Sequence, residues 1–247
     1  MKKELVLGFD IQAQPDEVTC GPTCLHALYN YYGDSMALAD VIKEVKKLRF
    51  GGTLAVMLGH HALKRGYSAH IYTYNLNVFD PTWFKDSSKQ MKRHLKAQMK
   101  FKTKRRKLQA ASAAYIKFLD AGGELRNSEL DEDLIKDYLN RSIPILTGLS
   151  ATYLYGTPRE IPQLDTYASI KGEPSGHFVV ITGYDESKNC VYIADPMEPN
   201  PLGKGHVYSV SFARLINSIM LGIVTYDANL LVIEPKEKKP HAKTDNS

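Results

Sequence analysis

Cys20 is the residue of this chain best placed to act as a nucleophile. Pro22 follows it closely, and proline suits the first turn of a helix, where its missing N–H costs nothing. Apolar residues then recur three and four apart, as on one helix face, at Leu25, Leu28, Tyr29 and Tyr32. Gly33 is a typical helix end. Cys20 is therefore predicted to begin a helix, where free N–H groups and the positive dipole end favour a reactive thiolate.

His177 and Asp195 are the candidate partners of this thiol. Two apolar runs, 178–184 and 190–194, flank a five-residue segment whose composition is typical of a turn, which predicts an antiparallel hairpin. Folding the chain about this turn brings His177 near Asp195. Asp185 is the other candidate, but at ~3.3 Å per residue it would lie roughly 26 Å from His177 along the strand. The sequence thus predicts that Asp195 orients the imidazole, in a site for acyl transfer through a thioester.

Four short motifs together resemble the peptidase C39-like branch of the papain-like cysteine peptidases, in its stand-alone bacterial form. They are Gln14, Cys20-Gly21-Pro22, Gly176-His177-Phe178 and Ala194-Asp195-Pro196. The resemblance extends over most of residues 5–235. It implies that the side-chain amide of Gln14 joins the Cys20 N–H in an oxyanion hole. It also implies an α+β, papain-like fold, with a helical N-terminal lobe whose nucleophile helix packs on an antiparallel sheet.

The resemblance implies a cysteine peptidase or amide hydrolase that acts on a peptide or isopeptide-like bond. Where the relatives that cut double-glycine leader peptides usually carry Asp before the cysteine, this chain has Thr19. Two alternatives stay open: an acyl or peptidyl transferase of the phytochelatin synthase type, and a non-catalytic docking module. Relatives are also found with peptide-ligating ATP-grasp enzymes, so such an enzyme is a candidate partner.

The remaining cysteines and histidines favour structural roles. Cys24 lies one helical turn after Cys20 and is expected to face the core, and Cys190 lies in a predicted strand. A Cys-x3-Cys spacing without a second ligand pair is a weak zinc signal. His60 and His61 fall within a predicted helix, so at most one of them faces inward. We therefore expect no metal and no cofactor.

Length and composition favour one catalytic domain. A chain of 247 residues with 43% hydrophobic content can fill a large core, here assigned to residues 1–235. Three cysteines do not make a disulfide framework, and the start of the chain lacks the apolar run of a signal peptide. No apolar stretch reaches membrane-spanning length, so a cytoplasmic, bacterial-type setting is expected. The charged tail at 236–247 is predicted to be disordered.

Positive charge is concentrated in residues 85–107. This segment holds eleven Lys or Arg residues against a single acid, Asp86, a local charge of +10 in a chain of net +5. Apolar residues at helical spacing continue beyond it, so a long or broken basic helix is predicted as an insertion at about 82–123. Its charge forms either a solvated face or a docking site for an acidic protein. Nucleic acid is disfavoured, because the most basic part has no interleaved aromatic residues.

The remaining pattern yields a coarse map of helices followed by antiparallel strands, which indicates an α+β fold. Helices are expected at about 21–32, 36–48, 54–65, 82–120 and 131–140. Strands are expected at about 4–9, 67–74, 144–149, 178–184, 190–194, 206–211 and 221–233, and a loop at 150–175.

Overall fold

The computed structural model describes residues 3–48, 52–161, 164, 166–203 and 205–236. Its α-helices are α1 (Cys20–Tyr31), α2 (Leu38–Glu44), α3 (Ala55–Lys64), α4 (Ser88–Phe101), α5 (Arg106–Asp120), α6 (Glu132–Asn140), α7 (Ala151–Tyr155) and α8 (Phe212–Leu221). Two 3-10 helices are η1 (Pro81–Lys85) and η2 (Gly222–Thr225). The strands are β1 (Glu4–Val6), β2 (Tyr67–Thr73), β3 (Glu124–Arg126), β4 (Ile145–Ser150), β5 (Glu160–Ile161), β6 (Thr166–Tyr167), β7 (Gly176–Asp185), β8 (Cys190–Ala194), β9 (Val207–Ser211) and β10 (Asn229–Pro235).

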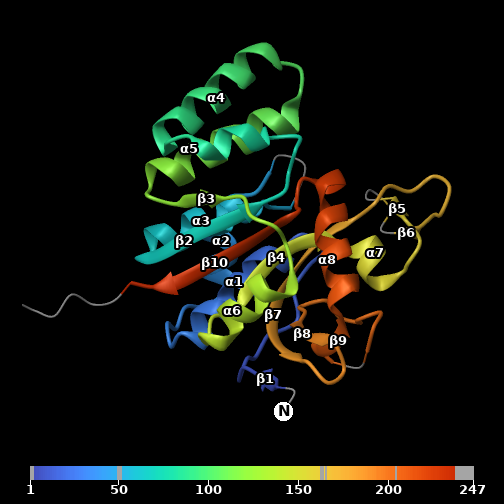
Figure 1. The fold of residues 1–247 in the computed structure, drawn as a ribbon. Coiled ribbons are helices and arrows are strands. Elements are labelled where there is room, and N and C mark those ends of the chain that lie inside the picture. Colours follow the sequence, from blue (N-terminus) through green and yellow to red (C-terminus); the bar gives the residue numbers. More distant parts are fainter. Residues whose placement is uncertain (1–2, 49–51, 162–163, 165, 204, 237–247) are drawn as a thin grey trace, which may run out of the picture.

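The centre of the molecule is an eight-stranded, mainly antiparallel sheet (Figure 1). Its strand order is β3-β2-β10-β4-β7-β8-β9, and β1 pairs with the far end of β7. Only β2 and β3 pair in parallel among the described strands. The α+β class and the antiparallel sheet predicted from sequence are confirmed.

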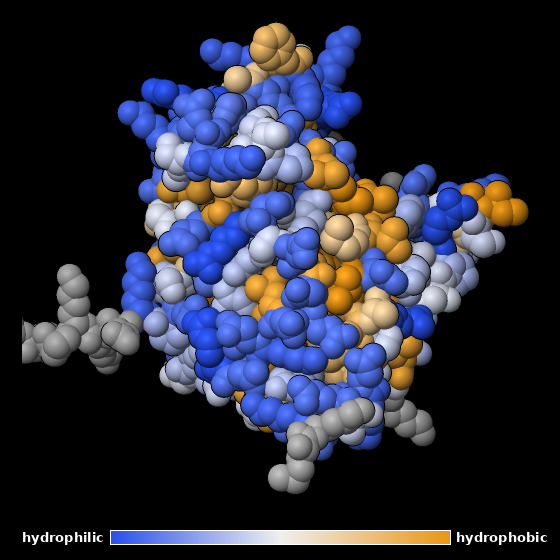
Figure 2. All heavy atoms as spheres, in the orientation of Figure 1, coloured by the Kyte–Doolittle hydropathy of each residue, from blue (hydrophilic) through white to orange (hydrophobic). Residues whose placement is uncertain are grey.

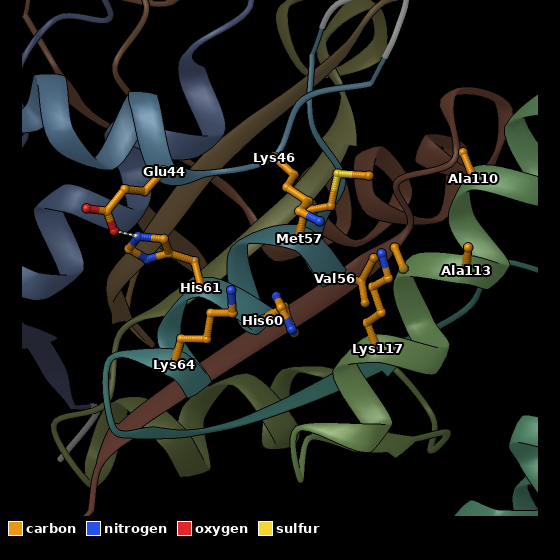
Figure 3. A pocket seen from close by; sticks show the side chains of 11 residues that line it. Glu44, Lys46, Val56, Met57, His60, His61, Lys64, Ala110, Ala113 and Lys117 are labelled. Atoms are coloured by element: carbon orange, nitrogen blue, oxygen red, sulfur yellow. Dashed lines mark hydrogen bonds and ion pairs between the residues drawn. The ribbon is translucent and has the colours of Figure 1, made fainter.

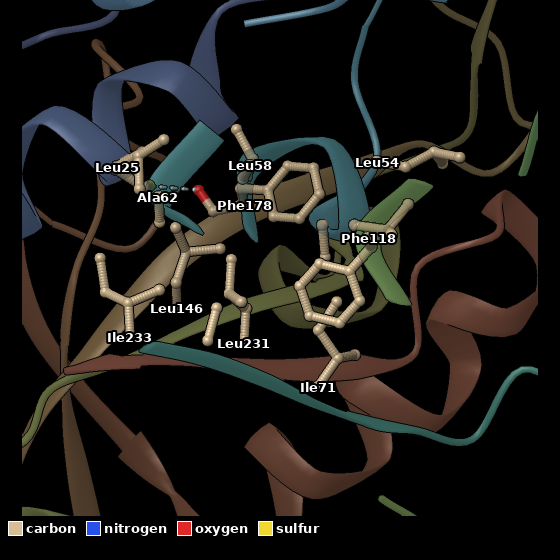
Figure 4. Close-up of a cluster of buried hydrophobic side chains, with 14 of the residues drawn as sticks. Leu25, Leu54, Leu58, Ala62, Ile71, Phe118, Leu146, Phe178, Leu231 and Ile233 are labelled. Carbon is tan, nitrogen blue, oxygen red and sulfur yellow. Dashed lines mark hydrogen bonds between the residues drawn. The ribbon is translucent and has the colours of Figure 1, made fainter. Parts of the chain in front are cut away.

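Helices cover both faces of this sheet, so the central strands are apolar on both sides. In β10, Leu231 and Ile233 belong to a core shared with α1, α3 and α5. Leu230 and Val232, which point the opposite way, belong to a second core with α6, α7 and α8. Figure 4 shows the first core, in which side chains from the helices face those from the strands. This double burial explains why the strands read as continuous apolar runs.

The predicted hairpin is present. β7 and β8 pair antiparallel, with Val180 opposite Ala194 and Asp185 opposite Cys190. The first strand begins at Gly176, two residues earlier than the apolar run suggests, and includes His177. The neighbouring strand β4 pairs with this end of β7, and Leu149 lies directly opposite His177.

The basic segment forms a helical hairpin, so of the two predicted forms, a long or a broken helix, the broken one is confirmed. After η1, α4 runs to Phe101, the chain reverses, and α5 runs back to Asp120. Gln109 fixes the reversal, because its Nε2 donates to the carbonyls of Met99 (2.8 Å) and Lys102 (3.0 Å) at the end of α4. Folding back lets the apolar stripes of the two helices pack together and on α3. The surface over this hairpin is mainly hydrophilic, at the top of the view in Figure 2.

Three parts of the structure differ from the pattern expected from sequence. The predicted strand at 221–233 is instead the end of α8, then η2, then β10; Ser211 starts α8 by accepting the Arg214 N–H at 3.2 Å. The predicted loop at 150–175 contains α7 and the short strands β5 and β6. The short strand β3 was not expected.

The predicted disordered tail lies, from residue 237 onward, outside the described residues. No described helix has the length and apolar character needed to cross a membrane.

Candidate active site

Cys20 is the first residue of α1, as predicted. The turn before it is built by Asp16 and Thr19: the Thr19 hydroxyl donates to the Asp16 carbonyl at 3.0 Å and accepts the Asp16 N–H at 3.2 Å. Thr19 is fully buried, and its carbonyl accepts the Thr23 hydroxyl at 2.8 Å. The thiol is therefore held at the start of the helix by a fixed, local hydrogen-bonded turn.

Gly21 lets this helix start approach the sheet closely. A Cβ at this position would lie 2.7 Å from Thr53 Cγ2 and 3.1 Å from the ring of Phe178, the residue after His177. One helical turn later, the Cys24 thiol donates to the Phe178 carbonyl at 3.2 Å. These contacts bring the start of α1 against the start of β7, where His177 lies.

His177 and Asp195 form a buried pair. His177 Nε2 lies 2.8 Å from Asp195 Oδ1, and the two side chains are 3% and 0% exposed. The hairpin geometry predicted from sequence is therefore confirmed. Because Asp195 occupies Nε2, Nδ1 is the ring nitrogen left free, and the Cys20 side chain is near enough to act on the pKa of His177.

The charges around His177 favour an imidazolium. Burial by itself would lower the pKa of His177, but Asp195 and Cys20 attract and hydrogen-bond the ring and raise its pKa to about 10. Burial likewise opposes ionisation of Asp195, but His177 and several hydrogen-bond donors hold its pKa below the usual range. The site thus keeps a negative carboxylate and a positive ring side by side in the interior.

Two tyrosines that the sequence did not single out complete the environment of Asp195. Tyr155 and Tyr208 each donate a hydroxyl to Asp195 Oδ2 at 2.7 Å. The Met197 N–H donates to the other oxygen, Oδ1, at 2.9 Å. Burial, followed by the charge of Asp195, raises the pKa of both phenols, so they remain donors. The carboxylate is thus fully satisfied and fixed in orientation.

Gln14 lies beside the Asp195 segment. Its backbone N–H donates to the carbonyl of Pro196 at 2.8 Å, which ties the loop before α1 to the end of β8. Its side-chain Nε2 donates to the Asp16 carbonyl at 3.0 Å. Its Oε1 is buried and has no hydrogen-bond partner among the described residues.

Asp185 lies at the opposite end of the hairpin, opposite Cys190 in the ladder. One carboxylate oxygen accepts the Ser187 N–H (2.8 Å), the Ser187 hydroxyl (2.6 Å) and the Lys188 N–H (3.2 Å). Asp185 therefore shapes the turn and has no part in the His177 site. Asp185 is itself buried, at 3% exposure.

Cys24 and Cys190 are buried, free thiols, as expected for structural cysteines. Burial, together with the nearby Cys20 and Asp195, raises the pKa of Cys24 well above its usual value, so this thiol stays protonated. The described residues hold no cluster of three or more His, Cys, Asp or Glu that could bind a metal ion.

His60 and His61 lie far from this chemistry, at a cavity of about 130 Å³ between α3 and α5 (Figure 3). His61 is structural: its ring nitrogens contact the Tyr29 hydroxyl (2.8 Å) and Glu44 (3.2 Å). His60 shares the rim with several lysines. Only His61 of the pair is buried, as the helical spacing predicts.

Asp227 is a second carboxyl beside the site that the sequence did not reveal. It is 5% exposed, accepts the Thr225 hydroxyl at 2.7 Å, and packs so closely on Gly176 that a Cβ there would overlap its Oδ2. Burial raises the pKa of Asp227 to about 7, although Thr225, Lys107 and His177 act in the opposite direction. Asp227 thus adjoins the backbone that carries His177.

Asp227→Asn should change the pH dependence of stability. In the unfolded chain this carboxyl ionises near pH 4, whereas the folded protein holds its proton to about pH 7. The wild type therefore loses stability as pH rises from 4 to 7, by up to about 4 kcal/mol, and the asparagine variant escapes this loss. Urea unfolding of both proteins at pH 4 and pH 8 tests this. If the free energies of unfolding of the two proteins differ by the same amount at pH 4 and at pH 8, the prediction is contradicted.

Comparison with known proteins agrees with this arrangement. The family model described as the Peptidase_C39 like family matches residues 6–218. A solved structure described as a C39-like peptidase from Bacillus anthracis aligns with a TM-score of 0.52 and 14% identity, covering 96% of this chain and 100% of that one. A double glycine motif protease from an AMS/PCAT transporter, solved with its leader peptide, aligns with a TM-score of 0.44 and 12% identity over 96% of this chain and 99% of its own.

The peptidase domain of Streptococcus ComA, a bi-functional ABC transporter involved in quorum sensing, gives a TM-score of 0.43 at 16% identity, over 92% of this chain and 99% of its own. No curated protein matches the chain. The match to the family model extends from the loop before Gln14 to beyond Asp195 and so includes both halves of the site. The chain therefore belongs to the Peptidase_C39 like family and has the papain-like fold of the C39 peptidases.

Proposed function

We propose that the protein is a cysteine peptidase that cleaves a peptide or isopeptide-like amide through a Cys20 thioester. The observation that carries this proposal is the position of His177 between Asp195 and Cys20, in surroundings that raise its pKa to about 10. An imidazolium beside a thiol at a helix N-terminus favours the thiolate, which is the nucleophilic form. Family membership supports the same reaction class.

In the first half of the reaction the Cys20 thiolate attacks the carbonyl carbon of the amide. As the C–S bond forms, the carbonyl oxygen becomes an oxyanion. Collapse of this intermediate breaks the C–N bond, and the His177 proton passes to the nitrogen of the leaving amine. The acyl group remains on Cys20 as a thioester.

Two donors are proposed to hold the oxyanion. The Cys20 N–H belongs to the first residue of α1, so it has no partner within the helix. The side-chain amide of Gln14 carries two N–H groups, of which one donates to the Asp16 carbonyl and leaves the other for substrate. The backbone bond from Gln14 to Pro196 supports this role, because it fixes the loop against the Asp195 segment.

In the second half, neutral His177 takes a proton from water, and the resulting hydroxide attacks the thioester carbonyl. The C–S bond breaks, a carboxylic acid leaves, and the thiolate–imidazolium pair is restored. Asp195 keeps the ring in the orientation that both halves need and stabilises its positive charge. Because the reaction needs a reduced thiol, we also propose a reducing compartment such as the cytoplasm.

The thioester can be trapped and weighed. Gln14→Ala keeps the thiol and His177 but removes one oxyanion donor, which should slow turnover by about 100-fold and let acyl-enzyme accumulate. After exposure to a peptide mixture, intact mass spectrometry should find an added mass on Cys20 that hydroxylamine removes. Cys20→Ala, treated in the same way, should carry none. An adduct on Cys24 or Cys190 would contradict the assignment of Cys20.

The basic hairpin is proposed to be an insertion, at about residues 82–123, on one catalytic domain that spans residues 1–235. Its support is that α5 packs on α3 while the sequence on either side supplies neighbouring strands of the sheet, β2 and β3. None of the residues proposed for catalysis lies within this insertion.

A further inference from the structure

The reversal between α4 and α5 carries an unbalanced positive charge. Four consecutive cations, Lys104, Arg105, Arg106 and Lys107, occupy it, and all four are exposed. None of them takes part in an ion pair with any of the residues that the structure describes. Elsewhere in the hairpin the acids are already used: Lys92 pairs with Asp120 at 2.5 Å, and His94 pairs with Asp86 at 2.9 Å.

These four cations form one wall of an open groove, and Asn77 and Tyr226 line it with them. The hollow has a volume of about 610 Å³. Lys107 Nζ lies 5.8 Å from the centre of the Tyr226 ring, and Asn77 Nδ2 donates to the Ile223 carbonyl at 3.2 Å. Gln109 also fixes the turn to the end of α4, so the backbone that carries the four cations is held in place.

A short series of contacts connects this groove with the proposed active site. Tyr226 precedes Asp227, which packs against Gly176, and Gly176 precedes His177. Neighbouring Cα atoms are ~3.8 Å apart, so two chain steps and the Asp227–Gly176 contact together place the Tyr226 backbone within roughly 15 Å of the His177 backbone. An extended peptide covers that span in roughly four or five residues.

We propose that this groove, defined by Asn77, residues 104–107 and Tyr226, binds acidic side chains of the peptide substrate about four or five residues from the bond that is cut. This proposal rests on the proposed peptidase function. Carboxylates would supply the counter-charges that the four cations lack, through charge-assisted hydrogen bonds to Arg and Lys. The short span from Tyr226 to His177 favours a peptide whose other end lies in the active site.

Binding can be measured without catalysis in full-length Cys20→Ala. The probe is a fluorescein-labelled peptide of roughly ten residues rich in Glu, compared with the same peptide carrying Gln in place of Glu. Fluorescence anisotropy at about 50 mM salt should show at least tenfold tighter binding of the Glu peptide, and about 300 mM salt should weaken it, because exposed charges are screened. Equal binding of the two peptides would overturn the proposal and leave the cysteine chemistry untouched.

A pair of charge-matched variants separates the groove from general basicity. Replacing Lys104, Arg105, Arg106 and Lys107 with Gln should weaken binding of the Glu peptide at least tenfold. Replacing Lys85, Lys89, Arg93 and Lys96 removes the same charge from exposed positions of η1 and α4 and should change binding less than threefold. If the two variants lose the same affinity for the Glu peptide, the proposal that the groove is the binding site is overturned.

A single-stranded RNA of similar length and charge supplies the second comparison. It should bind more weakly than the Glu peptide, and tighter binding of the RNA would overturn the peptide assignment. Thermal melting of each variant checks that it is folded. The proposed chemistry is tested separately by alkylation of Cys20. For this test the variant with Lys85, Lys89, Arg93 and Lys96 replaced is made with Cys20 in place of the alanine used for binding.

Discussion

His177→Ala should slow the alkylation of Cys20 by iodoacetamide about 100-fold at pH 6. With His177 in place, its pKa of about 10 keeps the imidazolium beside the thiolate throughout the neutral range. Without it, no imidazolium stabilises the thiolate, which is the nucleophilic form. Because His177 has a raised pKa, the imidazolium persists from pH 6 to pH 9, so the wild-type rate should depend less on pH than the rate of the variant.

The rate of the variant should instead rise with pH, because no neighbouring cation holds the thiolate at low pH. Peptide mass spectrometry at timed intervals gives the rate at each cysteine. Cys24 is the internal control, since it is buried and its raised pKa keeps it protonated, so it should label slowly in both proteins. If Cys20 in His177→Ala is alkylated at pH 6 as fast as in the wild type, His177 does not activate Cys20.

Asp195→Ala should be the most damaging single change at the site. It removes the acceptor of His177 and of the hydroxyls of Tyr155 and Tyr208, all of which are buried. Breaking a buried ion pair by removing one partner typically costs about 3–5 kcal/mol of stability. The imidazolium also loses its counter-charge, so the pKa of His177 should fall and Cys20 should react more slowly at pH 6. Urea unfolding and the alkylation assay measure the two effects.

The stability contributed by Asp195 has a defined pH window. Its pKa is depressed in the folded protein, so its contribution is present above about pH 4 and is lost as pH falls below that value. The pKa of His177 is raised from 6.5 to about 10 in the folded protein, so the full contribution has an upper limit of about pH 6.5 and is lost as pH rises from there to about 10. The difference between wild type and Asp195→Ala should therefore be largest between these limits and smaller at pH 3.

Asp185→Ala is the matched control, since Asp185 lies at the other end of the same two strands. This change removes the acceptor that shapes the β7–β8 turn, so some stability should be lost. Alkylation of Cys20 should nevertheless keep its wild-type rate at pH 6. Equal slowing in the two aspartate variants would mean that the fold of the hairpin, and not the Asp195 carboxylate, controls the thiol.

The local chemistry of the chain determined where the site begins. A cysteine followed by Gly21 and Pro22 starts a helix because helix ends are set by neighbouring residues, so Cys20 could be placed from sequence. The partnership of His177 with Asp195 followed from a single turn between two apolar runs, since the register of a hairpin is fixed by its turn. Gln14 was found only through the resemblance to a family, because its contacts cross to another segment.

Periodicity could not show how the basic segment folds. Residues 82–120 have the apolar spacing of a helix throughout, and the reversal after Phe101 depends on contacts between α4 and α5 and on the capping by Gln109. The same limit applies to α8, since most of its residues had no predicted element and the helix packs against β4, which is distant in the sequence.

The surroundings of the site were decided by tertiary structure alone. Tyr155 and Tyr208 lie 40 and 13 positions from Asp195 in the chain, yet both donate to the same oxygen. Asp227 reaches Gly176 from the segment before β10. A buried carboxylate takes its donors from whichever elements the packing brings to it, and its desolvation depends on how completely both faces of the sheet are covered. The spacing of residues in the sequence does not predict which elements will cover a side chain. The start of a helix and the turn of a hairpin can be predicted, because each depends on a few neighbouring residues.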